Sequence, residues 1–304
     1  MAKVVGMRDG ALPEVITIGE AMALVTPAVA EPIEHAEDFR LDTGGAESNV
    51  ASHLAALGRK AAWVGQLGDD FIGRRVLRLI AERGVDTSWV QLHDRAPTGV
   101  YFKDPGNGVQ YYRQGSAASM MEPSMLTRLP LETASLVHLS GITPALSSSC
   151  AAMIDAVVDQ LSALPTQVSF DVNFRPGLWD ARDAAAVLLD LSRRVDLVFV
   201  GLDEAAALWG THTPDEVREL LPEPRHLIVK DGDVGATEYS VAGKEFQPAI
   251  PTAVVEVVGA GDAFAAGYLN AHLASLPAAE RLQAGHQRAS LTLKSTSDFP
   301  QGLS

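Results

Sequence analysis

The stretch VVEVVGAGDAFAAG at residues 254–267 decides the fold, because an apolar run expected to be extended, a glycine turn, a carboxylate and a small-residue helix follow one another. Gly259 and Gly261 let the backbone turn sharply and let an anion approach the peptide N–H groups. Those groups open a helix, so unpaired donors and the positive end of the helix dipole face one point. The stretch therefore predicts a phosphate site, an anion hole formed by Gly259, Ala260 and Gly261.

Asp262 lies at the edge of this predicted anion hole. A carboxylate beside a phosphate is useful when it handles a proton or a hydroxyl group. Because the helix dipole favours its anion, we expect Asp262 to be a weak base that orients a hydroxyl and accepts its proton late. Taken alone, the stretch is explained more simply as a tight turn with Asp262 as a helix cap. The choice between this turn and a phosphate site therefore depends on the rest of the chain.

At this length, one large α/β domain with a small appendage and two separate domains are equally compatible with the chain. Because no repeat, low-complexity tract or linker is found, we expect one domain over residues 1–304 with a lid. The 304 residues are 47% hydrophobic and 20% charged, which is typical of a globular protein with a large core. The formal net charge of -14 argues against a nucleic-acid partner, because such proteins normally present a basic face.

The expected location is the cytoplasm. The single cysteine, Cys150, excludes an internal disulfide framework and fits a reducing compartment. Residues 1–13 lack the apolar core of a signal peptide, and no apolar run is long enough to span a bilayer, so no membrane partner is expected.

Strands and helices alternate along most of the chain, which predicts a mostly parallel sheet with helices on both faces. We expect strands at 14–19, 61–67, 136–140, 167–172, 197–200 and 227–230, and an extended run at 237–241. We expect helices at 50–57, 72–80, 147–163, 260–275 and 278–294.

Two segments interrupt the alternation, at about 20–43 and 97–116, and are expected to form a small β lid or a dimer flap. In the second, DPGNG at 104–108 joins two extended runs and predicts a hairpin. Tyr111 and Arg113 share one face of its second strand, where Tyr101 of the first strand can join them. A bare surface hairpin often carries Tyr and Arg as well, so the hairpin alone proves no site.

Other polar groups lie where ligands bind in open α/β sheets. Gly44 and Gly45 open a helix that carries Asn49, an amide able to bind a hydroxylated ligand. The run DVNFRP at 171–176 follows a strand and places Arg175 at its carboxyl end. Read alone, Gly44-Gly45 is better explained as a loop than as a site, and Asn49 is also explained by a hydrogen bond to a neighbouring strand.

Taken together, these motifs resemble the ribokinase-like (PfkB-type) sugar kinases over nearly the whole chain from about Val15. Gly44-Gly45 with Asn49 is similar to the first signature of that family, and Gly259-Ala260-Gly261-Asp262 to the second. The resemblance implies a three-layer α/β sandwich with a mostly parallel central sheet and a small β lid. The lid often makes the dimer contact, so a homodimer or higher homo-oligomer is expected.

Four stretches resemble 2-keto-3-deoxygluconate kinases in particular, namely GGAESNVA at 44–51, YYRQGSA at 111–117, SGITPAL at 140–146 and DVNFRPGLW at 171–179. The resemblance implies a sugar-acid pocket lined by Gly44, Gly45, Asn49, Tyr101, Tyr111, Arg113, Arg175 and, from the C-terminal segment, Asp298. Because Arg binds a carboxylate through two parallel bonds, two arginines would select a sugar acid over neutral sugars.

The same resemblance implies an ATP side formed by Asn173, Lys230, Gly232, Gly235 and Ser290. Mg²⁺ is expected as a cofactor, with Glu204 acting through a metal-bound water. Where many relatives have Asn-x-x-Glu, this chain has Gly201 in place of the Asn. Where they have Asp-Thr before the glycines, it has Glu256-Val257, which leaves a K⁺ requirement open.

The sequence therefore predicts an enzyme that transfers the ATP γ-phosphate to the terminal hydroxyl of 2-keto-3-deoxygluconate, with Asp262 as the catalytic residue. A kinase of fructose, ribose or a related keto-deoxy acid is the first alternative, and a non-catalytic metabolite-binding protein on the same fold is the second. An oxidoreductase is disfavoured, because no Gly-x-Gly-x-x-Gly follows the first strand.

Overall fold

The computed structural model describes residues 3–4, 12–29, 31–300 and 302. The segment 1–13, used above to argue against a signal peptide, lies mostly outside these residues. In the part of the chain that is described, no helix is both long and apolar enough to cross a membrane.

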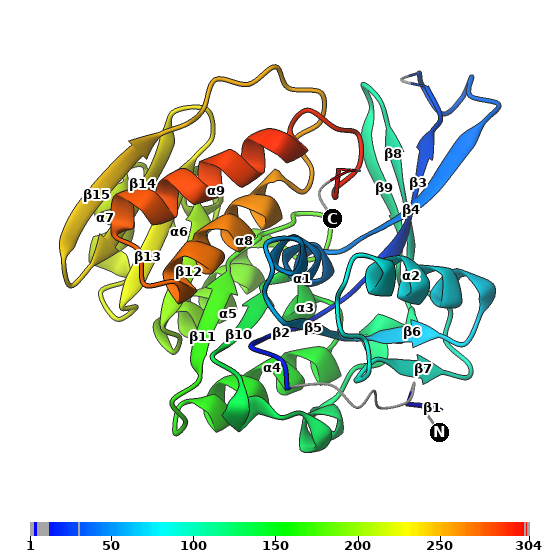
Figure 1. Cartoon of the computed structure of the whole chain (residues 1–304), viewed down its shortest axis with the longest axis horizontal. Helices are drawn as coiled ribbons and strands as arrows, with labels where there is room; N and C mark the ends of the chain where they lie inside the picture. Colours follow the sequence, from blue (N-terminus) through cyan, green and yellow to red (C-terminus); the bar gives the residue numbers. More distant parts are fainter. Residues whose placement is uncertain (1–2, 5–11, 30, 301, 303–304) are drawn as a thin grey trace.

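A central sheet of eight strands forms the body of the molecule, in the order β15-β14-β13-β12-β11-β10-β2-β5 (Figure 1). From β13 to β5 all neighbours pair in parallel, and β14 and β15 add an antiparallel edge. The bounds are β2 Val15–Ile18, β5 Ala61–Val64, β10 Leu136–Ser140, β11 Gln167–Asp171, β12 Leu197–Gly201, β13 His226–Asp231, β14 Gly235–Ser240 and β15 Gly243–Pro248. The expected fold class is confirmed.

Helices cover both faces of this sheet (Figure 1). One face packs against α1 Ala46–Ala56, α2 Phe71–Glu82, α8 Ala260–Leu273 and α9 Ala278–Thr292. The other packs against α4 Ser148–Leu161, α5 Ala181–Arg193, α6 Leu202–Trp209 and α7 Pro214–Leu220. Short helices complete the set, namely α3 Ile142–Ala145 and the 3₁₀ turns η1 Ala117–Met120, η2 Pro123–Arg128 and η3 Leu131–Thr133.

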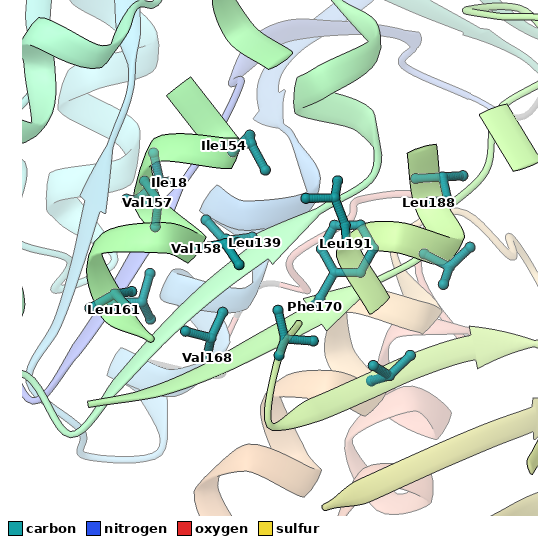
Figure 2. Packing of buried hydrophobic residues seen from close by; sticks show 14 of the residues in the cluster. Ile18, Leu139, Ile154, Val157, Val158, Leu161, Val168, Phe170, Leu188 and Leu191 are labelled. Atoms are coloured by element: carbon teal, nitrogen blue, oxygen red, sulfur yellow. The ribbon is translucent and has the colours of Figure 1, made fainter. Parts of the chain in front are cut away.

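Strand residues alternate between the two hydrophobic layers, as the pleat requires. In β12, Val198 and Val200 face the α4–α5 side, whereas Leu197 and Phe199 face α8. Figure 2 shows the first layer, where side chains of α4 such as Ile154 and Val157 pack beside Leu139 of β10. Both faces are therefore buried, which is why these strands are apolar throughout.

The two interrupting segments pair with each other in a second, four-stranded sheet, here called the small sheet. Its order is β4-β3-β8-β9, with bounds β3 Met22–Pro27, β4 Phe39–Gly44, β8 Val100–Asp104 and β9 Gly108–Tyr112. The expected hairpin is confirmed, since β8 and β9 pair antiparallel with Tyr101 opposite Tyr111. The small sheet extends from the edge of the central sheet beside α2 (Figure 1). Because β4 ends directly before α1, it brings Gly44 and Gly45 to the junction.

Two expectations about extended segments are wrong. The strand expected over 61–67 is divided at Gly65, where β6 Gln66–Gly68 leaves the central sheet to pair with β7 Gln91–His93, next to β1 Lys3–Val4. The apolar run 254–258 is not a strand, and Val254, Val255 and Val257 are 57–64% exposed. Its amides bond instead to the Leu293 carbonyl and to the side chain of Glu256, because no strand lies beside it.

Candidate active site

A cavity of about 940 Å³ lies at the carboxyl ends of β11, β12 and β13, between the small sheet and the first turn of α8. Every candidate residue except Gly44 lines it, namely Gly45, Asn49, Tyr101, Tyr111, Arg113, Asn173, Arg175, Glu204, Lys230, Gly232, Gly235, Gly259, Ala260, Gly261, Asp262, Ser290 and Asp298. Gly44 lies just behind the wall, where a Cβ would come within 2.0 Å of the Tyr101 hydroxyl.

The glycine turn before α8 has the geometry of an anion site. Gly259 has φ 87°, a left-handed value that suits glycine. The Ala260 amide bonds to the Val257 carbonyl, whereas the amides of Gly261 and Asp262 have no partner among the described residues. Two backbone N–H donors therefore remain free at the positive end of the helix dipole, fewer than the four that a helix N-terminus can offer.

Asp262 is almost completely buried and accepts a hydrogen bond from Asn49 Nδ2 at 2.8 Å. The pKa of this carboxyl is raised from 3.8 to about 7, mainly by burial. The nearby carboxylates of Asp171 and Asp298 contribute to the rise, and the Asn49 bond and Arg175 oppose it. The expectation of a weak base is therefore wrong: desolvation outweighs the helix dipole, and Asp262 is a stronger base than a free Asp.

The sugar side of the cavity is built around Asp298, which the sequence assigned only by resemblance. Its carboxylate accepts from the Tyr101 hydroxyl at 2.7 Å and from Asn49 Nδ2 at 3.4 Å. Lys103, which does not line the cavity, donates to its other oxygen. Asn49 thus contacts both Asp262 and Asp298, and its own Oδ1 is buried without a partner.

Arg113 lines the cavity but is not a free cation. Its guanidinium forms an ion pair with Glu20, and both side chains are buried. Arg113 also lies over the Tyr111 ring, which stacks on Tyr101, so the expected shared face is confirmed. Burial raises the pKa of Glu20, an effect that the Arg113 charge opposes. Arg113 Nε has no protein partner.

Arg175 is more exposed than Arg113 and lies at the opposite wall. Its side chain is 47% exposed, donates to the Phe174 carbonyl at 3.0 Å and approaches Glu204 at 3.5 Å. Glu204 also accepts from the Gly201 amide at 2.8 Å as part of a helix cap. Within the protein, Glu204 therefore serves as an acidic cap at the start of α6.

The remaining candidates form the other end of the cavity. Lys230 pairs with Asp171 at 2.9 Å, and although burial alone lowers the pKa of Lys230, Asp171 and Glu204 raise it overall. Asn173 has a left-handed φ of 40°, and its buried Oδ1 has no hydrogen-bond partner among the described residues, so this position is strained in the protein alone. Gly232, with φ 49°, leaves the wall open.

Glu20, Lys103 and Asp171 are the site residues that sequence reasoning missed. Glu20 closely follows the first predicted strand, and Asp171 is the first residue of the DVNFRP run. Polar residues at the carboxyl ends of parallel strands often contact ligands, so the sequence contained a signal for both residues. Lys103 carried no such signal. It lies in a surface hairpin, and only the folded chain shows that it is buried.

Comparisons with known proteins identify the class. Residues 12–299 match the model of the pfkB family carbohydrate kinases. The chain is 31% identical to a 2-dehydro-3-deoxygluconokinase of Bacillus subtilis (strain 168), covering 94% of this chain and 91% of that protein. It is also 31% identical to a 2-dehydro-3-deoxygalactonokinase of Haloferax volcanii, with coverages of 91% and 90%. The chain therefore belongs to the pfkB family of carbohydrate kinases.

Solved structures agree on the fold. A PfkB protein from Polaromonas sp. JS666 superposes with a TM-score of 0.86 at 35% identity, covering 94% of this chain and 97% of that one. A putative ribokinase II from E. coli, solved in complex with ATP and Mg²⁺, superposes with a TM-score of 0.86 at 21% identity and 94% coverage of both chains. This protein is thus a carbohydrate kinase with the ribokinase-like fold.

Proposed function

We propose that this kinase transfers the γ-phosphate of ATP to the terminal hydroxyl of a 2-keto-3-deoxy sugar acid, with 2-keto-3-deoxygluconate as the first candidate. The observation that carries the proposal is one cavity lined both by Asp262, at the N-terminus of α8, and by the arginines Arg113 and Arg175. The names of the two 31%-identical relatives support the same substrate class.

Asp262 acts as the proton acceptor. It binds the acceptor hydroxyl, whose oxygen forms the new bond to the γ-phosphorus while the bond from that phosphorus to the bridging oxygen breaks. The proton passes to Asp262, and the free amides of Gly261 and Asp262 stabilise the charge on the transferred group. A carboxyl with a pKa near 7 suits this role, and such groups contribute about 10²–10⁴-fold to rate.

Sugar recognition falls to the small sheet and α1. Arg113 lines the cavity with its guanidinium paired to Glu20, so the sugar carboxylate would bind beside this ion pair. Asn49 and Asp298 also line the cavity and offer an amide and a carboxylate to the sugar hydroxyls. Tyr101 and Tyr111 form a stacked wall against the carbon chain. Arg175, at the opposite wall, supplies a second cation.

ATP and Mg²⁺ fit the other end of the cavity. Asn173 with its unpartnered Oδ1, Lys230, Gly232, Gly235 and Ser290 lie on the wall that would hold the nucleotide. Among the described residues no group of three or more His, Cys, Asp or Glu side chains could hold a metal. Mg²⁺ would therefore be held mainly by phosphate oxygens and water, with Glu204 contacting a bound water, and would neutralise phosphate charge.

The whole chain acts as one kinase domain in this proposal, and the small sheet is its lid. The outer face of that sheet carries an aromatic pair, Phe102 and Tyr112, with Tyr112 63% exposed. This supports a homodimer formed through the lid. The single cysteine supports a cytoplasmic location.

A kinase of a neutral sugar is the second candidate, because the Glu20–Arg113 ion pair leaves the sugar end less positive than two free arginines would. An ADP-release assay with Mg·ATP separates the two when 2-keto-3-deoxygluconate, 2-keto-3-deoxygalactonate, fructose and ribose are compared. Turnover confined to the keto-deoxy acids supports the proposal. Equal or better turnover of a neutral sugar contradicts it, and silence on all four favours a binding protein or another acceptor.

A further inference from the structure

Lys103 is a buried lysine of the small sheet that lies outside the cavity. It follows Tyr101 by two residues on β8, so both side chains lie on the same face of the strand. The Lys103 side chain is only 4% exposed. Its ammonium donates to Asp298 Oδ1 and to the Thr296 carbonyl, the latter at 3.3 Å. A buried ammonium is costly unless it is paired, so the Asp298 carboxylate is what makes its burial possible.

Asp298 is the point where three parts of the fold meet. The small sheet contributes Lys103 and Tyr101, and α1 contributes Asn49. The same Asn49 Nδ2 donates to Asp262 at 2.8 Å. A continuous chain of polar contacts therefore runs from Lys103, behind the cavity wall, through Asp298 and Asn49 to the proposed proton acceptor.

The backbone of Asp298 is held from the opposite side by His53 of α1. Arg288 Nε, from α9, donates to His53 Nδ1 at 2.8 Å. The proton of the neutral imidazole is therefore on Nε2, which donates to the Asp298 carbonyl at 3.3 Å. Burial lowers the pKa of His53 to about 3, so this contact does not depend on a His charge at neutral pH. With its backbone held, the Asp298 carboxylate depends on Lys103 and its other donors for orientation and charge balance.

We propose that Lys103 is a positioning residue for phosphoryl transfer, which holds the Asp298 carboxylate beside Asn49 and balances its charge, so that the Asn49 amide remains shared with Asp262. This inference rests on the proposed role of Asp262. It assigns Lys103 no contact with the sugar, since the side chain does not line the cavity.

The charge balance matters because Asp262 sits among several groups. Besides Asn49, four other parts of the chain bring groups that interact with the charge of Asp262. These groups are Tyr111 of β9, Asp171 and Arg175 at and after the end of β11, Lys230 of β13 and Asp298 of the C-terminal segment. Asp171 is paired with Lys230 as Asp298 is with Lys103. Each of these two anions thus has its own ammonium. Arg83, at the end of α2, also acts on the Asp298 charge, but its guanidinium bonds to Asp42. Removal of Lys103 therefore takes away the cation that contacts the Asp298 carboxylate directly.

The test follows the carboxyl carbons of ¹³C-labelled Asp by NMR as pH is varied, with the Asp262 signal assigned by its absence in Asp262→Asn. We expect Lys103→Met to raise the midpoint of Asp262 by about one pH unit, because the Asp298 charge beside it is then less well balanced. Asp298→Asn, which leaves the ammonium, lowers the midpoint of Asp262. The double variant, which removes both charges, returns the Asp262 midpoint close to the wild-type value.

The acid limb of kcat/KM, measured with whichever sugar turns over, should move in the same order among these variants. Lys103→Arg keeps the charge and should keep the wild-type midpoint. Lys244→Met is a control, because Lys244 is also paired with an aspartate, Asp215, but this aspartate, unlike Asp298, does not line the cavity. It should leave midpoint and activity unchanged.

A wild-type midpoint in Lys103→Met, with only a lower thermal stability, overturns the inference and leaves Lys103 as an anchor for the C-terminal segment. If Lys103→Met does not fold, the inference is tested with Asp298→Asn and Lys103→Arg instead. An Asp262 midpoint that is unchanged in Asp298→Asn also overturns the inference. The NMR readout needs no sugar, so a wrong substrate leaves this test intact. Full turnover in Asp262→Asn would instead contradict the proposed function.

Discussion

Asn49 Nδ2 donates to Asp262 Oδ2 at 2.8 Å, although the two residues are 213 positions apart in the sequence. The contact joins the first helix of the chain to the helix that opens with the glycine turn. It opposes the effect of burial on the pKa of Asp262, because a donor to the carboxylate favours the charged form. Asn49 therefore tunes the proposed proton acceptor as well as facing the ligand.

Replacing Asn49 by Ala should lower kcat about 10- to 100-fold, the equivalent of one hydrogen bond to a charged group, about 1.5–3 kcal/mol. The acid limb of the pH profile should also move to higher pH, because Asp262 loses the donor that stabilises its anion. Ser52→Ala is the matched control. Ser52 is a buried polar residue of the same helix whose hydroxyl bonds only to the Ser48 carbonyl. Equal losses in both variants would mean that α1 is merely destabilised.

The activity of the wild-type protein should fall on the acid side of about pH 7. Burial holds the pKa of Asp262 above its ordinary value, so the carboxyl is protonated below that pH and cannot accept the hydroxyl proton. In the profile of kcat/KM, which reports the free enzyme, the rate should decrease about tenfold per pH unit below the limb. A profile that stays flat down to pH 5 would contradict the assignment of Asp262 as the base.

The same raised pKa affects stability with a definite sign. A carboxyl whose pKa is higher in the folded than in the unfolded state binds more protons when folded, so it favours folding at low pH. That contribution is lost as pH rises from about 4 to about 7. Asp262→Asn should therefore raise the thermal midpoint at pH 8 more than at pH 4, as scanning calorimetry at both pH values would show. A larger gain at pH 4 would contradict the burial argument.

The Glu20–Arg113 pair should decide affinity for the sugar acid. The double variant Glu20→Gln, Arg113→Met removes both charges, so no unpaired ion is left buried. We expect binding of 2-keto-3-deoxygluconate, measured by calorimetry, to weaken about 10- to 100-fold, the equivalent of one charge-assisted bond. ATP affinity should change little, since neither residue lies at the nucleotide end. A loss confined to ATP affinity would show that the ends of the cavity are assigned the wrong way round.

Much of the fold follows from local patterns. The alternation of apolar strands and amphipathic helices predicted the parallel sheet, and DPGNG predicted the β8–β9 hairpin, because such signals depend on near neighbours. Helix α5 was missed although Ala184, Leu188 and Leu191 mark its buried face at helical spacing. The run 254–258 was misread because apolar valines suit a strand only where a neighbouring strand exists to pair with them.

The candidate site was less accessible to sequence reasoning wherever its chemistry depends on pairing. The motif residues were brought together as expected, because they follow parallel strands or open helices at one edge of the sheet. The ion pairs of Arg113 with Glu20 and of Asp298 with Lys103 join residues 93 and 195 positions apart. No local pattern encodes them. The basicity of Asp262 was misjudged for the same reason, since it depends on burial that only the folded chain produces.

The most direct test of the central claim is the Asp262→Asn variant, assayed for ADP release with Mg·ATP and 2-keto-3-deoxygluconate while ATP affinity is measured by calorimetry. Asn keeps the size of the side chain but cannot accept the proton. We predict that turnover falls by about 10² or more with ATP affinity nearly intact. Turnover close to the wild-type rate would contradict the account, because the carboxylate at the N-terminus of α8 would then not be the acceptor of the hydroxyl proton.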